Sequence, residues 1–355
     1  MLSRTADHLF WMARYMERAE NTARMLDVNV QTSLLPERSG SVEAAWSAVL
    51  GISELHDAYH AHHHSISREG VTHFMVRDAS NHSSIASCLS AARENARAVR
   101  SVLTTELWET TNQTWLEFTR MMASDALARD PSAVFEWVKF RSHLSRGVTV
   151  GTMLQDEALH FIRLGTFLER GDNTARLLDV KFHDHPHGDG SVPGEGPSMH
   201  RSSTAAPPAP QALHAIQAAP AGRPTRPTRP TLYIATETDF YHWSALLRSV
   251  SAFEIYRRVY SSVILPEKVA ELLILRPDMP RSLAACTSEL VDNLALVANQ
   301  QSGDTLRRAG RLRSDLQYGR IDEILDDGLH AYLTLFLNRI NDIGDRIARD
   351  FLAAA

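Results

Sequence analysis

Apolar residues recur every three or four positions along most of this chain, and this spacing limits the possible folds more than any other feature. The first long example steps through Leu9, Met12, Met16, Ala19, Ala23, Leu26 and Val30. Such a stripe is typical of one face of a helix. Residues 83–122 continue the pattern with an expected break near Thr104 or Thr110, and a further helix is expected to open at Pro131. No convincing alternating strand appears, so we expect an all-α protein, an antiparallel multi-helix bundle.

One segment interrupts the helical pattern. Residues 183–230 are rich in Pro, Ala, Gly and Ser, and such a composition cannot bury enough apolar surface to offset the entropy of ordering. We therefore expect a long disordered insert there. It would link an N-terminal helical part, residues 1–182, to a C-terminal helical part, residues 231–355, and the two parts would pack together as one domain.

Charge and cysteine content exclude several classes of protein. The net charge is −5 with a pI near 6.4, so no global basic field favours nucleic acid. No apolar run is long enough to cross a bilayer, and Arg4 and Asp7 interrupt the region where a signal peptide needs an apolar core. Cys88 and Cys286 lie far apart in the chain, which favours a reducing compartment. We expect a cytoplasmic protein without nucleic-acid or membrane partners.

A polar motif occurs twice. The stretch ERAENTARMLDV, residues 17–28, reappears as ERGDNTARLLDV, residues 169–180, which predicts an internal duplication. On a helical wheel of about 100° per residue, one arc opposite the apolar stripe carries carboxylate, amide and guanidinium groups, while Glu20 and Asp172 fall at the border of the stripe. The arc comprises Arg14, Glu17, Arg18, Asn21 and Arg24 in the first copy, and Glu169, Arg170, Asn173 and Arg176 in the second.

Three interpretations of this arc are open at the level of sequence. A solvated helix face would gain roughly 0.2–0.5 kcal/mol per ion pair, but it would tolerate many other charge arrangements. A buried network could pair each Glu with the Arg of the other copy about a pseudo-twofold axis, and loss of one partner would cost roughly 3–5 kcal/mol. A substrate- or partner-binding surface would use the Arg forks and the amide to hold a phosphate or an amino-acid backbone.

Two other clusters are weaker candidates for a site. His56, His60 and His64 recur every four residues and would align on a helix, as zinc ligands can, but no Cys accompanies them and we expect no metal. Arg97 lies on a cationic helix face and is a candidate for contact with an anion or substrate. The chain has no GxxxxGK phosphate loop, so we expect it to bind neither ATP nor another cofactor by itself.

Several stretches resemble the alpha-E domain family, all-helical bacterial proteins named for a Glu-Arg motif. The likeness is carried by MLSRTADHLFWMARYMERAENTARMLDV, SSIASCLSAARENARAVRSVLTTELWETTN, FLERGDNTARLLDVKF and LPEKVAELLILRPDMPRSLAAC, and it covers almost the whole chain except residues 183–230. The resemblance implies a circularly permuted ATP-grasp protein as partner, often beside transglutaminase-like proteins. It implies no catalytic residues, and only the residues of the duplicated motif carry over.

The resemblance and the duplicated arc lead to one functional expectation. We expect a helical component of an ATP-grasp-linked system that forms amide or peptide bonds, with ATP and magnesium on the partner. This chain would bind an amino-acid or peptide acceptor or shape the active site of the partner, and whether it is itself part of the ligase enzyme stays open. The alternative is a non-catalytic scaffold or regulatory partner whose motifs form a buried network. A third class, a self-sufficient enzyme, would use carboxylates or a metal at the histidine run.

Overall fold

The computed structural model describes residues 1–33, 42–183, 237–261 and 263–352, and these residues form helices and short connections without a β-strand. The all-α prediction is therefore confirmed. The first eight helices are α1 (Ser3–Ser33), α2 (Val42–Ile52), α3 (His56–His60), α4 (Arg68–Val76), α5 (Ile85–Ala98), α6 (Thr105–Met122), α7 (Ala126–Arg129) and α8 (Pro131–Thr152). The next eight are α9 (Glu157–His183), α10 (Glu237–Ser249), α11 (Phe253–Tyr260), α12 (Pro266–Ile274), α13 (Leu283–Leu296), α14 (Gly303–Tyr318), α15 (Ile321–Asp327) and α16 (Leu329–Phe351).

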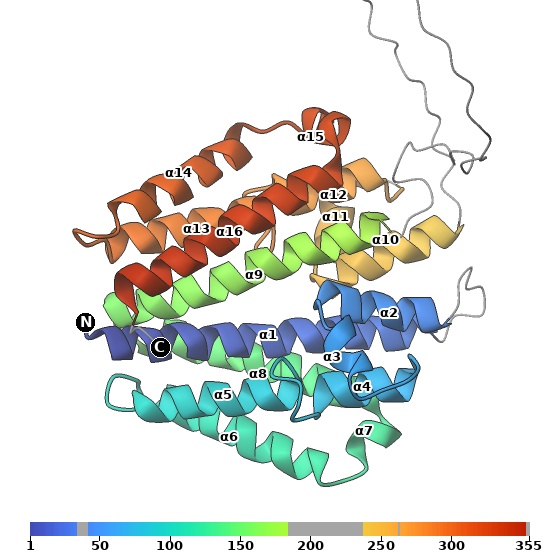
Figure 1. Cartoon of the computed structure of the whole chain (residues 1–355), viewed down its shortest axis with the longest axis horizontal. Coiled ribbons are helices and arrows are strands. Elements are labelled where there is room, and N and C mark those ends of the chain that lie inside the picture. The colour runs from blue at the N-terminus through green and yellow to red at the C-terminus, as the bar shows by residue number, and fades with distance from the viewer. Residues whose placement is uncertain (34–41, 184–236, 262, 353–355) are drawn as a thin grey trace, which may run out of the picture.

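The second eight helices repeat the first eight in order and in packing. In Figure 1, α1 and α9 cross the middle of the molecule, with α5, α6 and α8 on one side and α13, α14 and α16 on the other. α1 packs on α5 and α8 as α9 packs on α13 and α16, and α6 bridges α5 and α8 as α14 bridges α13 and α16. The internal duplication thus extends from the motif helix to whole repeats, α1–α8 and α9–α16.

Individual side chains confirm the correspondence between the repeats. Ser84 and Ser282 accept a backbone N–H at the starts of α5 and α13, as Ser and Thr do at helix N-caps. Equivalent positions elsewhere carry the same residue, and the hydrogen bond from a histidine ring to an asparagine recurs at 2.8 and 2.9 Å. The matched residues are Trp46 and Trp243, Tyr59 and Tyr256, Cys88 and Cys286, His8 and His160, and Asn95 and Asn293.

Helix direction differs between the centre and the outside of the bundle. Within a repeat, neighbouring helices run antiparallel: Glu17 meets Arg146 while Asp27 meets Lys139. The central helices α1 and α9 instead run parallel. The N-terminus at Met1 contacts Glu157 near the start of α9, and Glu17, further along α1, contacts Arg170, further along α9. Parallel central helices place equivalent positions of the two repeats directly opposite each other.

The boundaries expected from composition do not coincide with the repeats. Residues 1–182 include α9, which opens the second repeat and packs against α13 and α16. Most of the expected insert, from residue 184 to 230, lies outside the described residues. None of the helices in the described ranges combines the length and apolar character needed to cross a membrane.

Candidate functional site: a buried network between the repeats

The two copies of the motif face each other across the contact between α1 and α9. Glu17 accepts two hydrogen bonds from Arg170, both at 2.9 Å. Glu169 accepts two from Arg18, at 2.6 and 3.0 Å, so each glutamate pairs with the arginine of the other copy. Both glutamates are at most 5% exposed. This reciprocal pairing matches the buried-network interpretation and excludes a solvated helix face.

Glu20 is the centre of a second group of contacts. The helical wheel places it at the border of the apolar stripe, but α1 is covered by α5, α8, α9 and α10, and Glu20 is fully buried. One of its partners, Arg281, lies just before α13 and is also 3.0 Å from Glu17. The groups that donate to Glu20 are Arg24 at 2.8 Å, Ser142 at 2.6 Å, Arg146 at 2.5 Å and Arg281 at 2.6 Å.

Guanidinium groups outnumber carboxylates in this region. Three carboxylates contact six guanidinium groups, and we call these nine side chains the Glu–Arg network. A surplus of positive charge in a partly dry environment attracts anions strongly. The members of the network are Glu17, Glu20 and Glu169 with Arg14, Arg18, Arg24, Arg146, Arg170 and Arg281.

Burial and ion pairing shift the pKa values of the carboxyl groups in opposite directions. Burial alone would raise the pKa of Glu169, but Arg14 and Arg18 outweigh it and bring that pKa to about 2. Burial also opposes ionisation of Glu17 and Glu20, yet the surrounding guanidinium groups hold the pKa of both carboxyls below the usual range. The carboxylates are therefore ionised at neutral pH, and the surplus of positive charge is what remains after they are counted.

The remaining residues of the first copy join the same network. Arg14 donates to Glu169 at 2.8 Å. The Asn21 oxygen accepts from Arg281 at 2.9 Å, while the Asn21 amide nitrogen is buried and has no hydrogen-bond partner among the described residues. Arg24 extends beyond Glu20 towards Ser251, whose hydroxyl it meets at 2.6 Å.

The second copy forms a smaller cluster. Arg176 pairs with Asp172 at 2.8 Å and with Glu54 of the first repeat. Asn173 is half-buried and joins neither cluster in the described part of the chain. Burial raises the pKa of Asp172, and the pairing with Arg176 opposes that rise. The two copies of the motif therefore have different surroundings despite their shared residues.

The two weaker candidates lie apart from the network. Arg97 is exposed and pairs with Glu94 one turn away, at 2.8 Å, so it belongs to a solvated face. α3 ends at His60, so His64 does not continue the helical row of His56 and His60. Within the described ranges, no group of three or more His, Cys, Asp or Glu side chains could hold a metal ion.

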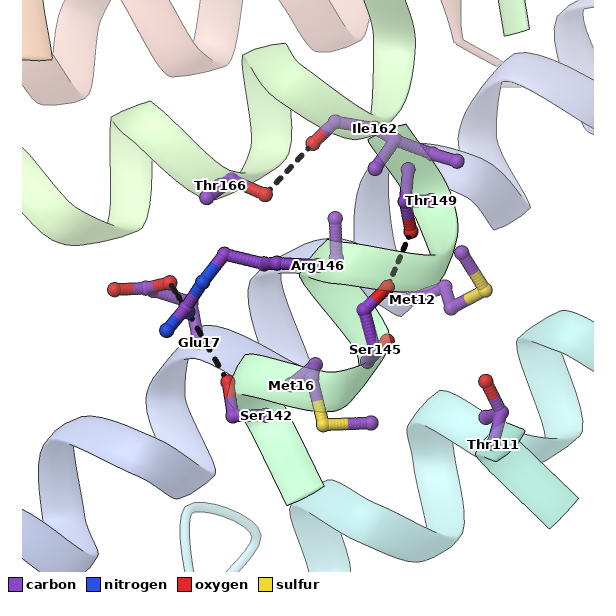
Figure 2. Close-up of a pocket in the computed structure, with 11 residues that line it drawn as sticks. Met12, Met16, Glu17, Thr111, Ser142, Ser145, Arg146, Thr149, Ile162 and Thr166 are labelled. Carbon is purple, nitrogen blue, oxygen red and sulfur yellow. Dashed lines mark hydrogen bonds and ion pairs between the residues drawn. The ribbon is translucent and has the colours of Figure 1, made fainter. Parts of the chain in front are cut away.

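A small cavity lies beside the network, between α1, α6, α8 and α9. Its volume is about 30 Å³, and a water molecule needs roughly 10–15 Å³ of such space, so it admits a small polar group. Figure 2 shows Glu17 and Arg146 together on one side of it. Apolar side chains of α1 and α9 form part of the wall, and hydroxyl groups form the rest: Thr111, Ser142, Ser145, Thr149 and Thr166.

The outer helices of the second repeat have no hydroxyl or charged residues at the equivalent places. The Cys88–Cys286 and Asn95–Asn293 pairs set the register, and the buried positions of the outer helices follow the same spacing. The place of Arg146 is taken by Gly344, where a Cβ would lie 3.0 Å from Leu168. In this register Thr111, Ser142, Ser145 and Thr149 correspond to Ala309, Ile340, Ile343 and Ile347, all buried.

Comparison with known proteins identifies the family. A family model matches residues 1–352, and its description reads "a predicted alpha-helical domain with a conserved ER motif". This chain belongs to the Alpha-E family. No curated protein and no solved structure matches it. This Alpha-E chain carries Glu-Arg in both copies of its repeated motif, Glu17-Arg18 and Glu169-Arg170, the residues that pair across α1 and α9.

Each repeat of this Alpha-E chain also places one cysteine near the network. Cys88 lies near Arg18 and Glu169, and Cys286 lies near Arg170 and Arg281. Burial raises the pKa of both thiols to about 12. Since the thiolate is the reactive form, both are protonated packing residues in the folded chain.

Several members of the site were not found from the sequence. Arg146, Arg281, His143 and Ser251 lie on helices and turns with no copy of the motif. A usable signal did exist for Arg281, because it directly precedes the capped SLAAC stretch, the counterpart of SIASC at residues 84–88. Comparing those two stretches would have placed Arg281 near the second Glu-Arg helix.

Proposed function

We propose that this Alpha-E chain is the substrate-holding helical component of an ATP-grasp-linked system that forms amide or peptide bonds. ATP and magnesium would bind to the partner, a circularly permuted ATP-grasp protein. This chain would hold the amino-acid or peptide acceptor, or shape the active site of the partner, at the cavity beside Glu17 and Arg146.

One observation supports this proposal: the outer helices carry hydroxyl groups at the cavity in the first repeat and apolar side chains at the equivalent positions of the second. Isoleucine at these positions packs the second repeat, so the architecture does not need hydroxyl groups there. Burying hydroxyls in place of methyl groups gives up apolar burial of about 25 cal/mol per Å². A binding role for Ser145 and Thr149 accounts for that cost.

The lining suits part of an amino acid or peptide. Arg146 can form paired hydrogen bonds with a carboxylate, and hydroxyl groups can accept from an amine or amide. Glu17 is ionised and faces the same space, so it can attract an ammonium group. The volume suits a small polar group of an acceptor rather than a nucleotide.

The test is ATP turnover by the pair of proteins. The chain is co-purified with the circularly permuted ATP-grasp protein of the same genome, and phosphate release is measured against a panel of amino acids and short peptides. We expect turnover with the pair that neither protein shows alone, and the responsive compound identifies the acceptor. Absence of both synergy and co-elution would count against the proposal.

A matched set of variants connects the activity to the cavity. Ser145→Ala and Thr149→Val remove hydroxyl groups without adding much volume, so the fold should persist. We expect them to lower turnover by the pair at least tenfold, while Ile347→Val at the equivalent position of the second repeat leaves turnover unchanged. Equal effects in both repeats would show that the lining acts only through packing.

The scaffold alternative is favoured by a different observation, the burial of the reciprocal ion pairs. Arg18–Glu169 and Arg170–Glu17 join the two repeats at their centre. If holding the repeats together is their whole role, Glu17→Gln unfolds the chain and any loss of turnover follows the loss of folded protein. A folded but inactive Glu17→Gln variant would favour the substrate-holding role instead.

A further inference from the structure

Arg24 and Arg146 converge on one histidine at an opening beside the network. His143 lies on α8 with its side chain exposed. Arg24 approaches its Nε2 at 3.0 Å, and Arg146 approaches its Nδ1 at 2.7 Å. Ser251, also exposed, meets Arg24 from the turn between α10 and α11. Four side chains from α1, α8 and that turn therefore surround one point at the surface.

These contacts cannot all be hydrogen bonds. A guanidinium group only donates, and a neutral imidazole has one accepting nitrogen while a protonated one has none. In either tautomer, one guanidinium N–H therefore faces a ring N–H. Partial loss of solvent around the ring lowers the pKa of His143, and the nearby Arg146 and Arg24 add to that effect, while Glu20 opposes it. The opening thus presents more donors than its own side chains can accept.

The equivalent place in the second repeat is neutralised by a carboxylate. Ser251 corresponds to Glu54, and both hold the same left-handed backbone conformation, with φ of 55°. Glu54 pairs with Arg176, the counterpart of Arg24. Arg176 also pairs with Asp172, which contacts no other arginine in the described residues. Arg24 thus meets a hydroxyl group, Ser251 of the second repeat, where Arg176 meets a carboxylate, Glu54 of the first repeat.

The charges that face the opening confirm the surplus. Arg24 shares Glu20 with Arg146 and Arg281, and Arg281 and Arg146 also contact Glu17. Arg170 reaches Glu17 from α9 as well. Two carboxylates therefore serve four guanidinium groups around the opening, whereas Arg176 alone has two carboxylates.

We infer that this opening is a binding site for a small oxyanion, a carboxylate or phosphate group held between Arg24 and Arg146. Ser251 Oγ–H and the N–H of neutral His143 supply two further donors. The bound oxygen atoms accept the N–H groups that otherwise face each other at the imidazole. The inference concerns the chain alone and does not depend on an ATP-grasp partner, although Arg146 also lines the cavity.

The test compares anion binding by the natural chain with binding by a variant that places its own carboxylate at the opening. Inorganic phosphate and, separately, acetate are titrated into the full chain at low ionic strength, and binding is followed by calorimetry. We expect saturable binding of at least one of them, and the comparison decides between the phosphate and carboxylate classes. Ser251→Glu should place a carboxylate on Arg24, as Glu54 does on Arg176, and weaken binding at least tenfold.

Two controls keep the result decisive. Glu54→Ser makes the reverse change beside Arg176, which Asp172 still neutralises, so it should leave the binding constant unchanged. Arg146→Gln should also weaken binding at least tenfold, and it serves as the test if Ser251→Glu does not fold. The inference is overturned if neither anion binds saturably, or if folded Ser251→Glu binds as tightly as the natural chain.

Discussion

At the scale of single residues, position in the repeated motif does not determine the role of a side chain. Glu20 and Asp172 are equivalent, but Glu20 contacts three arginines and Asp172 contacts one. The difference comes from Arg146 on α8 and from Arg281 in the turn before α13, which both reach Glu20. Ion pairs buried in this way offset a large desolvation cost, so removal of one partner leaves a charge without compensation.

Glu169→Gln tests this residue-scale dependence. The change leaves Arg14 and Arg18 without a carboxylate while they are 17% and 27% exposed. Partial solvation limits the loss, so we expect the free energy of unfolding at pH 7 to fall by about 3 kcal/mol, the low end for a broken buried pair. Urea denaturation followed by circular dichroism measures it, and a loss below about 1 kcal/mol would contradict a buried structural pair.

The same carboxyl predicts the acid sensitivity of the fold. Its pKa is about 2 in the folded chain, against an ordinary value of 4.5 for a glutamate carboxyl, so the unfolded chain takes up the proton first as the pH falls. The stabilisation is complete above about pH 4.5 and is lost as the pH falls towards 2, with a total on the order of 3 kcal/mol. Denaturation midpoints between pH 7 and pH 2.5 should fall less steeply for Glu169→Gln, and parallel curves would refute the assignment.

Sequence reasoning identified the charged pairs more successfully than their surroundings. It singled out Glu17, Arg18, Glu169 and Arg170 because an identical repeat is more than a solvated face requires. It placed Glu20 at a border because a helical wheel assumes a solvent side, and α1 has none at that level. Partners without a motif, such as Arg281, depend on tertiary contacts that no local pattern in one sequence records.

At the scale of helices, the central contact depends on small residues. α1 and α9 approach so closely that a Cβ on Gly165 would lie 2.3 Å from the carbonyl oxygen of Phe10. Ala13, the counterpart of Gly165, lies beside it at 3.3 Å. This close approach sets the depth at which the two motif copies meet, since Glu17 and Arg170 lie about one turn further along.

Gly165→Ala should therefore separate the two central helices. A backbone oxygen cannot yield as a flexible side chain does, and we expect a loss of about 3 kcal/mol, the cost of strong overpacking. Gly147→Ala on α8 is the matched control, because a Cβ there meets nothing within 4 Å. It should be neutral or stabilise by up to about 1 kcal/mol, and similar thermal unfolding of both variants would contradict the close contact.

Helix boundaries were more predictable than helix directions. The break expected near Thr104 is the N-cap of α6, and Pro131 opens α8 as expected, because caps and proline act locally. The parallel course of α1 and α9 was not expected, since hydrophobic periodicity is the same in either direction. The second repeat was recognised only in its motif helix, because the residues that the outer helices share, such as Trp46 and Trp243, are scattered single matches rather than a continuous motif.

At the scale of the whole molecule, the repeats exchange contacts. α2 of the first repeat packs against α9, and α10 of the second packs against α1. The buried pairs at the centre also cross from one repeat to the other. Neither repeat therefore encloses its own central helix, and the two halves depend on each other for their cores.

We accordingly expect the chain to unfold in one cooperative transition. Circular dichroism follows the helices of both repeats, whereas five of the six tryptophans lie in the first repeat and only Trp243 lies in the second. The two signals should nevertheless give coincident curves in urea. Two separated transitions, or a stable fragment of residues 1–152 after limited proteolysis, would show that the repeats fold independently.

The two buried thiols allow the opening of each repeat to be measured separately. A cysteine that is protonated and covered reacts with an alkylating reagent only when its surroundings open, so the rate of modification reports the frequency of opening. Cys88 reports on the first half and Cys286 on the second. Mass spectrometry of the two cysteine-containing peptides measures both rates of modification. Equal rates of modification would mean that the two halves open together. Unequal rates would show which half of this duplicated protein opens more often while the other stays folded.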